Sequence, residues 1–573
     1  MRFIAFISIV ILFQTKIMGQ ITDLYKKNQS PEYADVLAYY RQLDQTSEYA
    51  KLIECGPTDI GENLQLFVID ADNEFDPTAS RKRNKSILLI DNGIHPGEPD
   101  GIDACIKLTT ELLQSKNIEE QLKNLTICII LVYNIDGCLN RNSTTRINQN
   151  GPEEYGFRGN AQNYDLNRDF IKCDALNALS FTEIFRHWDP DIFVDTHVSN
   201  GADYQYVMTL IATQHSKLTT ALDDYLQQKL SPFLYAEMNE AGFPMCPYVN
   251  EIDKIPDNGI SGFLDLPRYS TGYTALFNTI GFMPETHMLK DYDQRVESTY
   301  ELLKIFIRFC NAHAVEIIDV RNKAVESTKN QREFPVNWEL DREQEGAFLF
   351  KGYEAKYKPS EVSGLTRLYY DRNSPFEKNI PYYNDYKVTQ LITAPKTYII
   401  PQAWRRVIER LKINRVEMTQ LSKDTIMEVE VYYLDKFNTS PDAYEGHYYH
   451  NHLELHTEKQ KIQLHKGDYM IPVNQAANRY IVETLEPQAP DSFFSWGFFD
   501  AVLMQKEWYS DYVFEDLAAE ILNKDPQLRN LLEEKKSTDM AFANDADAQL
   551  QFVLMHSVYH EKSHMRYPVY RSN

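Results

Sequence analysis

Basic residues and cysteines are both scarce in this chain. It has 59 Lys and Arg against 83 Asp and Glu, which gives a formal net charge of -24 over 573 residues. Nucleic-acid binding depends on Lys and Arg side chains that neutralise phosphates, so this balance excludes nucleic acid as an expected partner. The 7 cysteines are odd in number and scattered, and they indicate no disulfide framework.

A hydrophobic run long enough to cross a membrane is also missing. A transmembrane helix needs about 20 apolar residues. The apolar run at residues 3–13 is shorter, and no later stretch qualifies. Arg2 precedes this run and a more polar stretch ending in Gly19-Gln20 follows it, as in a secretory signal peptide. We expect residues 1–20 to be cleaved near Gly19 and the mature chain to be secreted or periplasmic.

The length and the hydrophobic pattern predict several domains. A chain of 573 residues exceeds what one hydrophobic core usually supports. In residues 21–330, strand-like and helix-like patterns alternate, which predicts a catalytic domain with a mixed α/β sheet and helices on both faces. The expected strands are 87–90, 125–132 and 192–196, and the expected helices are 98–114 and 175–188.

The chain changes character after residue 330. Residues 331–345 are charged and predict a linker, and short strand-like runs then dominate. We expect a β-rich accessory domain at 346–487 and a helical C-terminal segment at 488–573. No internal repeat is evident.

Four short segments carry side chains that suit a zinc site. A catalytic zinc takes three protein ligands and leaves the fourth tetrahedral position open. His95, Glu98 and His197 would supply such a set, and both histidines follow predicted strands, where α/β enzymes place their chemistry. The segments are His95-Pro-Gly-Glu98, Asp165-Leu-Asn167-Arg168, Asp195-Thr-His197 and Pro284-Glu285-Thr286.

A second His-x-x-Glu occurs at His313 and Glu316. It lies in residues 300–325, where apolar side chains recur at helical spacing. No other metal-competent segment accompanies it, so we interpret it as part of an ordinary helix.

Histidines also gather in the β-rich region. His450, His452, Glu454 and His456 alternate at strand spacing, with His447 nearby, and could share one face. We interpret them as a polar strand face, because a metal site there would need a ligand from another element. A second metal site is the open alternative.

The order of the four segments resembles the zinc metallocarboxypeptidase family, the carboxypeptidase A-like peptidases, over roughly residues 33–312. The chain looks like a secreted, bacterial-type member with a C-terminal accessory region. The resemblance implies one Zn²⁺ per chain, held by His95, Glu98 and His197, with Glu285 as the catalytic carboxylate. The chemistry agrees, because a carboxylate beside zinc can take a proton from the activated water.

The resemblance also assigns the residues that contact substrate. Asn167 and Arg168 match the pair that holds a terminal carboxylate, for which a guanidinium fork is suited. Asp165 matches a carboxylate that orients a zinc-binding histidine.

Two further assignments rest on looser matches. Arg146 is the candidate for polarising the substrate carbonyl, with Arg141 and Arg158 close by. Tyr273 is the candidate tyrosine that closes over substrate, and Tyr269 is the second choice.

Three functions follow from these assignments. The preferred one is a secreted zinc carboxypeptidase that cleaves C-terminal residues from peptides with a free C-terminus. A zinc deacylase of N-acyl amino acids shares similar motifs and is the alternative enzyme. The non-enzyme alternative is an inactive module that binds peptide or cell-wall material. The oligomeric state and the side-chain preference cannot be read from the sequence.

Overall fold

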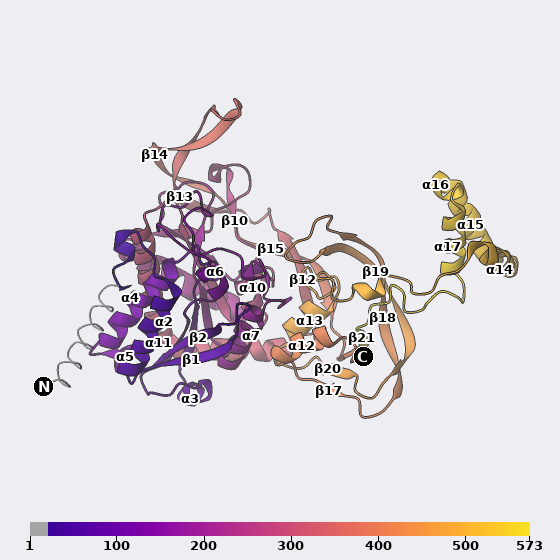
Figure 1. The fold of residues 1–573 in the computed structure, drawn as a ribbon, viewed down its shortest axis with the longest axis horizontal. Helices are drawn as coiled ribbons and strands as arrows, with labels where there is room; N and C mark the ends of the chain where they lie inside the picture. The colour runs from indigo at the N-terminus through magenta and orange to yellow at the C-terminus, as the bar shows by residue number, and fades with distance from the viewer. Residues whose placement is uncertain (1–20) are drawn as a thin grey trace.

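The computed structural model describes residues 21–573, so the predicted signal peptide lies outside the described part. Figure 1 shows a mixed α/β region at one end of an elongated molecule, a β-rich region next to it and a small group of helices at the far end. No helix in residues 21–573 is both long and apolar enough to cross a membrane. All seven cysteines are free thiols.

The α/β region is built on one mixed sheet with the strand order β1-β2-β4-β3-β5-β11-β7-β8, and β6 also pairs with β11. Strands β4, β3, β5 and β11 are parallel neighbours. Every residue of β3, β4 and β5 is buried, which explains their continuous apolar sequences. The strands are β1 (Ala50–Pro57), β2 (Asn63–Asp70), β3 (Ser86–Asp91), β4 (Leu125–Ile130), β5 (Ile192–Asp195), β6 (His197–Ser199), β7 (Met208–Ala212), β8 (Met245–Pro247) and β11 (Ile280–His287).

Helices flank this sheet, as predicted. In Figure 1, α2 and α4 lie on one side of it and α7 and α10 on the other. The long helix α11 packs on α4 and contains the second His-x-x-Glu, as expected. The main helices are α2 (Tyr33–Thr46), α4 (Asp100–Gln114), α7 (Leu176–Trp188), α8 (Thr220–Tyr225), α9 (Ser231–Glu240), α10 (Ser270–Ala275) and α11 (Tyr292–Asn330). Shorter ones are α3 (Pro77–Lys82), α5 (Ile118–Gln121), α6 (Ile135–Leu139) and η2 (Leu166–Arg168).

The β-rich part of the chain forms two different structures. Strands β13 (Gly346–Pro359) and β14 (Thr366–Tyr383) make a long hairpin that pairs with β10 (Ile260–Ser261) of the α/β region. The remaining strands include a six-stranded sheet in the order β17-β20-β16-β21-β18-β19. Its members are β16 (Thr397–Ile400), β17 (Thr419–Gln420), β18 (Thr425–Thr439), β19 (His450–Leu464), β20 (Tyr469–Pro472) and β21 (Tyr570–Ser572), with α12 (Arg405–Ile413) and α13 (Asn478–Leu485) beside it.

The expected linker at 331–345 contains a strand instead. Strand β12 (Glu333–Leu340) pairs with β15 (Tyr386–Thr393). Phe334, Val336 and Trp338 are buried on one face of it, and the exposed Glu333 and Glu339 lie on the other face.

The expected helical segment at 488–573 is helical only in its middle. Its helices α14 (Asp511–Lys524), α15 (Pro526–Thr538), α16 (Met540–Ala543) and α17 (Ala546–Met555) share a small apolar core of their own. The chain then returns to the six-stranded sheet as β21, where Arg571 pairs with the buried Glu486. The last residues therefore belong to the β-rich part of the molecule.

Candidate active site

The first two candidate ligands lie in the loop between β3 and α4. His95 and Glu98 follow the end of β3 at Asp91 and precede the first residue of α4. Gly97, between them, leaves room for another side chain, because a Cβ there would lie 2.5 Å from Cδ of Arg146. The loop sequence therefore admits an arginine beside the two ligands.

The third candidate ligand comes from the neighbouring strand. Strands β3 and β5 are parallel and place Asp91 opposite Asp195, so their carboxyl ends meet at one edge of the sheet. His197 follows at the start of β6. His95, Glu98 and His197 are 3%, 3% and 4% exposed, respectively.

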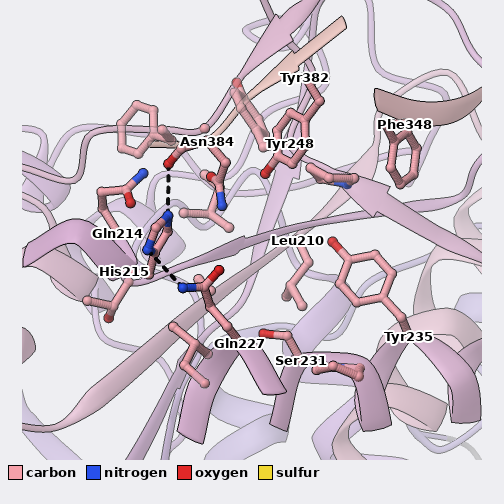
Figure 2. A pocket seen from close by; sticks show the side chains of 18 residues that line it. Leu210, Gln214, His215, Gln227, Ser231, Tyr235, Tyr248, Phe348, Tyr382 and Asn384 are labelled. Atoms are coloured by element: carbon pink, nitrogen blue, oxygen red, sulfur yellow. Dashed lines mark hydrogen bonds between the residues drawn. The ribbon is translucent and has the colours of Figure 1, made fainter. Parts of the chain in front are cut away.

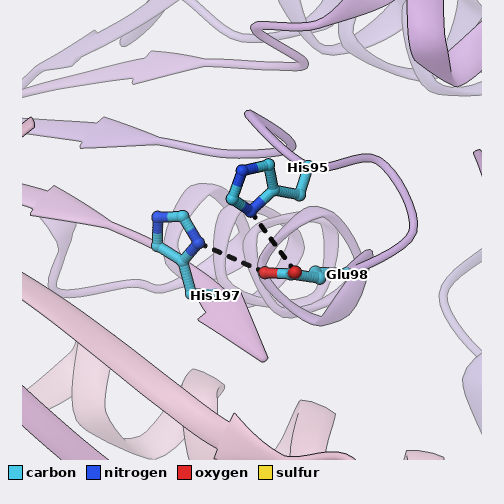
Figure 3. Close-up of side chains that lie close together, drawn as sticks. All are labelled: His95, Glu98 and His197. Atoms are coloured by element: carbon cyan, nitrogen blue, oxygen red, sulfur yellow. Dashed lines mark hydrogen bonds and ion pairs between the residues drawn. The ribbon is translucent and has the colours of Figure 1, made fainter. Parts of the chain in front are cut away.

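The three side chains converge, and dashed lines in Figure 3 join the Glu98 carboxylate to both imidazoles. Oε1 of Glu98 is 3.3 Å from Nδ1 of His95, and Oε2 is 3.2 Å from Nδ1 of His197. One ligand atom from each residue lies within 4.8 Å of the others, and no other such group occurs in residues 21–573. Nδ1 of His95 is buried without a hydrogen-bond partner among these residues. This donor set fits a zinc ion with an open coordination position.

Each imidazole has a carboxylate at its other nitrogen. Oδ1 of Asp165 is 2.9 Å from Nε2 of His95, and Oδ2 of Asp195 is 2.9 Å from Nε2 of His197. Such pairs fix the ring orientation and the tautomer of a metal-binding histidine. Asp165 was predicted to have this role, whereas Asp195 was not. The Asp-Thr-His spacing was the available signal, because alternate residues of a strand point to the same side.

The pKa values of two of the candidate ligands, Glu98 and His197, are strongly shifted. Burial alone would raise the pKa of Glu98, but the Arg146 guanidinium and His95 lower it well below its usual range. Burial alone would lower the pKa of His197, but Asp195 and Glu98 raise it well above its usual range. A cation bound by these groups would therefore compete with a proton on His197.

Glu285 lies beside the three candidate ligands. Strands β6 and β11 are parallel and place Glu285 opposite His197. The two residues line one cavity of about 270 Å³ together with His95 and Glu98. Burial raises the pKa of Glu285 to about 8, so this carboxyl group can gain and lose a proton near neutral pH.

Two arginines reach the carboxylate of Glu98. Arg146 donates from Nη1 to Oε1 of Glu98 at 2.7 Å and from Nη2 to the carbonyl of Val198 at 3.3 Å. Arg158 donates from Nη1 to the same Oε1 at 3.5 Å and from Nε to Asp165 at 2.9 Å. Both arginines line the cavity. Arg146, the predicted carbonyl-polarising residue, therefore lies beside a second cavity-lining arginine, Arg158.

Asn167 and Arg168 lie in the short helix η2 and line the cavity. Asp165 caps the N-terminus of this helix. Asp165 accepts a hydrogen bond from the backbone N–H of Asn167 at 2.9 Å. The guanidinium of Arg168 lies over the ring of Tyr269, 4.6 Å from its centroid. Its Nη1 donates to the carbonyl of Asn167, while Nε and Nη2 have no hydrogen-bond partner in the described part of the chain. Part of the guanidinium fork is therefore available to a ligand.

Tyr273 does not line the cavity, so the prediction that it closes over substrate is wrong. Its side chain is 0% exposed, within a cluster of aromatic rings. Its hydroxyl donates to Oδ1 of Asn414 at 2.7 Å. Tyr273 is a core residue whose polar end is satisfied, whereas Tyr269, the second choice, lines the cavity.

A mostly apolar cavity of about 340 Å³ adjoins the site and shares Ile211, Tyr248 and Phe263 with it. Figure 2 shows aromatic side chains around much of this space. His215 lies at its edge, 3.1 Å from the carbonyl of Asn384 and 3.1 Å from the side-chain nitrogen of Gln227.

The accessory histidines are separated by the structure. His450 is buried and contacts Thr439 and Asp500, both at 2.9 Å. His452 has a left-handed φ of 52°, and the pairing of β18 with β19 shifts register nearby, so the alternation breaks. These histidines therefore do not share one polar face as predicted, and they form no metal-binding group within residues 21–573.

The sequence comparisons with known proteins point to a zinc carboxypeptidase domain. Residues 36–264 match the zinc carboxypeptidase family. Carboxypeptidase 2 of Trichophyton tonsurans is 22% identical over 435 residues, covering 72% of this chain and 74% of that protein. Carboxypeptidase 2 of Trichophyton rubrum is 21% identical over 486 residues, covering 80% and 82%. A metallo-carboxypeptidase from Burkholderia cenocepacia, known as a crystal structure, has a TM-score of 0.35 and 14% identity, covering 48% of this chain and 68% of that chain.

The α/β fold and the buried His-Glu-His centre define a metal-dependent hydrolase. Within this class, residues 36–264 match the zinc carboxypeptidase family, and the chain is a metallocarboxypeptidase. The family match ends at residue 264, before β11 begins, so the role of Glu285 has to be argued from the structure.

Proposed function

We propose that this metallocarboxypeptidase is an exported enzyme that removes C-terminal residues from peptides, with one zinc ion per chain and Glu285 as the general base. The observation that carries the proposal is a shared cavity. Glu285, Arg168 and the three candidate ligands all line it. A substrate bound there would meet the base, the metal ligands and the available part of the Arg168 guanidinium together.

Proton transfer would be the task of Glu285. Zinc, when bound, would polarise the scissile carbonyl and lower the pKa of a water at its open position. Glu285 would take the proton of the attacking water on a carboxylate oxygen and deliver it to the leaving amine. Its raised pKa suits this double role, because the carboxyl group holds the proton until the amine leaves.

The arginines would bind two groups of the substrate, the carbonyl oxygen of the scissile bond and the terminal carboxylate. Arg146 or Arg158, beside Glu98, would donate to the carbonyl oxygen as negative charge develops on it. Arg168 and Asn167 would bind the terminal carboxylate of the substrate. This division predicts that a free C-terminus is required.

Product analysis tests the substrate class. A blocked dipeptide, its C-terminal amide and an N-acyl amino acid are offered to the zinc-loaded enzyme. We expect the dipeptide to release its C-terminal amino acid, with the amide cleaved much more slowly. Faster turnover of the N-acyl amino acid would favour the deacylase alternative, and no turnover of any of the three would favour a binding module.

Export is proposed from the sequence of residues 1–20. Determination of the N-terminus of the protein recovered outside the cytoplasm should give a chain that begins near residue 20. Retention of Met1 on the mature protein would contradict cleavage.

A further inference from the structure

A β-turn of the accessory region reaches the loop that carries Asp165. The turn, Tyr444–His447, lies between β18 and β19, and we call it the tip turn. Tyr444 and His447 exchange two backbone hydrogen bonds, at 2.8 and 3.0 Å. Glu445 and Gly446 between them have φ angles of 49° and 80°. Two central residues with positive φ are characteristic of a type I′ hairpin turn.

The tip turn fits closely against the residue that precedes Asp165. A Cβ on Gly446 would lie 2.7 Å from Cε1 of Tyr164, so a larger residue at this position would require the Tyr164 ring to move. Glu445 adopts a left-handed conformation that side-chain-bearing residues rarely take. Such conformations persist where surrounding contacts determine them, often at functional sites.

Glu445 accepts a hydrogen bond from the backbone of the loop that carries Asp165. The N–H of Asp165 donates to Oε2 of Glu445 at 2.8 Å. The side chain of Asp165 in turn accepts from the N–H of Asn167 and pairs with His95. Glu445 therefore holds the residue that caps η2, the short helix from which Asn167 and Arg168 project.

Further contacts hold the surroundings of Arg168. Nε2 of His447 lies 2.5 Å from Oδ2 of Asp174, farther along the same loop. Arg268 donates to Asp491 of the accessory region from its backbone N–H at 2.8 Å and from Nε at 2.9 Å. Arg268 precedes Tyr269, the ring under the Arg168 guanidinium. The accessory region thus holds the chain on both sides of Arg168.

We propose that the accessory region keeps Asn167 and Arg168 in the geometry that binds the substrate carboxylate, with Glu445 as a positioning residue. Glu445 does not line the cavity, so it acts through Asp165 and touches no substrate. The inference rests on the proposed function, since it assumes that Arg168 binds the terminal carboxylate. It gives the β-rich region a role in the affinity for substrate.

Glu445→Ala in the full-length, zinc-loaded enzyme tests the inference. We expect KM for a blocked dipeptide to rise about tenfold, the usual size of a lost charge-assisted hydrogen bond, with kcat within about twofold of wild type. Zinc content and Tm should not change. Glu445→Gln keeps an acceptor oxygen and should hold KM within about threefold. Asp442→Asn removes an exposed charge from the same loop and should leave KM unchanged.

A double-mutant cycle with Arg168→Ala separates positioning from a general structural effect. Glu445→Ala should add nothing to KM when Arg168 is already absent. An unchanged KM in Glu445→Ala, or the same added loss in both backgrounds, would overturn the inference. If Arg168→Ala itself binds peptide and C-terminal amide as wild type does, the proposed carboxylate recognition fails instead.

Discussion

The spacing His-x-x-Glu occurs twice in this chain, in two different environments. His95 and Glu98 lie in a loop at the end of a central strand and are 3% exposed. The side chains of His313 and Glu316 lie on α11 and are 32% and 42% exposed. The two pairs have similar separations, 3.3 and 3.5 Å between imidazole nitrogen and carboxylate oxygen. The spacing creates a pair, and the surroundings decide whether the pair becomes a metal centre.

The surroundings differ in what faces each pair. The first pair has His197 as a third donor and carboxylates behind both imidazoles. In the second pair, Glu316 is engaged by Lys229, and the His313 ring packs on Phe309 at 4.6 Å. A lysine at the carboxylate repels a cation that the same carboxylate would otherwise attract. Burial and charge therefore separate the two copies.

Among the variants considered, His197→Ala should have the largest effect on zinc binding and activity. It removes the third donor and leaves His95 and Glu98 as an isolated pair, like His313 and Glu316. Without the third donor, zinc would be bound by two residues only, and the loss of activity should be roughly a thousandfold or more. Metal content after dialysis and peptidase activity measure both effects. His313→Ala is the matched control and should keep both.

Substitution of a carboxylate that holds a zinc-binding imidazole should have the second-largest effect. Asp195→Asn should lower zinc affinity or activity by about 10- to 100-fold, because the His197 ring loses the partner that fixes its orientation. Competition with a chelator gives the affinity. Asp319→Asn, an exposed residue on α11 beyond the second pair, should change neither quantity. Equal zinc affinities for wild type and Asp195→Asn would contradict the role of this carboxylate in metal binding.

Acid should weaken zinc binding at the first pair. Because Asp195 and Glu98 raise the pKa of His197 despite burial, the metal-free centre keeps a proton until the pH exceeds this raised value. Zinc has to displace the proton, so affinity should fall as the pH is lowered, by up to about tenfold per unit for each proton released. Chelator competition at several pH values tests the sign. An affinity independent of pH would contradict the protonated centre.

The second pair should contribute little. Glu316→Gln removes a partly exposed ion pair with Lys229, for which a change in unfolding free energy below about 1 kcal/mol is expected. Thermal unfolding measures it, with zinc content as the second readout. A loss of bound zinc in this variant would show that the second pair also holds metal.

The central fold could be predicted because its strands are buried on both faces. Residues 87–90 and 192–194 are apolar for this reason, and the observed β3 and β5 agree with the predicted strands 87–90 and 192–196 to within a residue at each end. The pairing of the β13–β14 hairpin with β10 could not be predicted, since local alternation gives a strand but no partner. The return of the chain end to the sheet as β21 depends on equally distant contacts.

The same division holds for the site. His95, Glu98 and His197 could be found because each belongs to a short motif at a strand end. Tyr273 was misassigned, because its position in the sequence does not reveal that its ring is buried and its hydroxyl is bonded to Asn414. Glu445 left no local signal, since it lies 280 residues from the backbone N–H that it binds.

The most direct test of the central claim compares zinc content and peptidase activity in wild type and Glu285→Gln. The variant keeps His95, Glu98 and His197 and removes only the proposed base. We expect one zinc per chain in both proteins and loss of most hydrolysis in the variant. Full activity of Glu285→Gln, or a wild-type protein that binds no zinc, would contradict it.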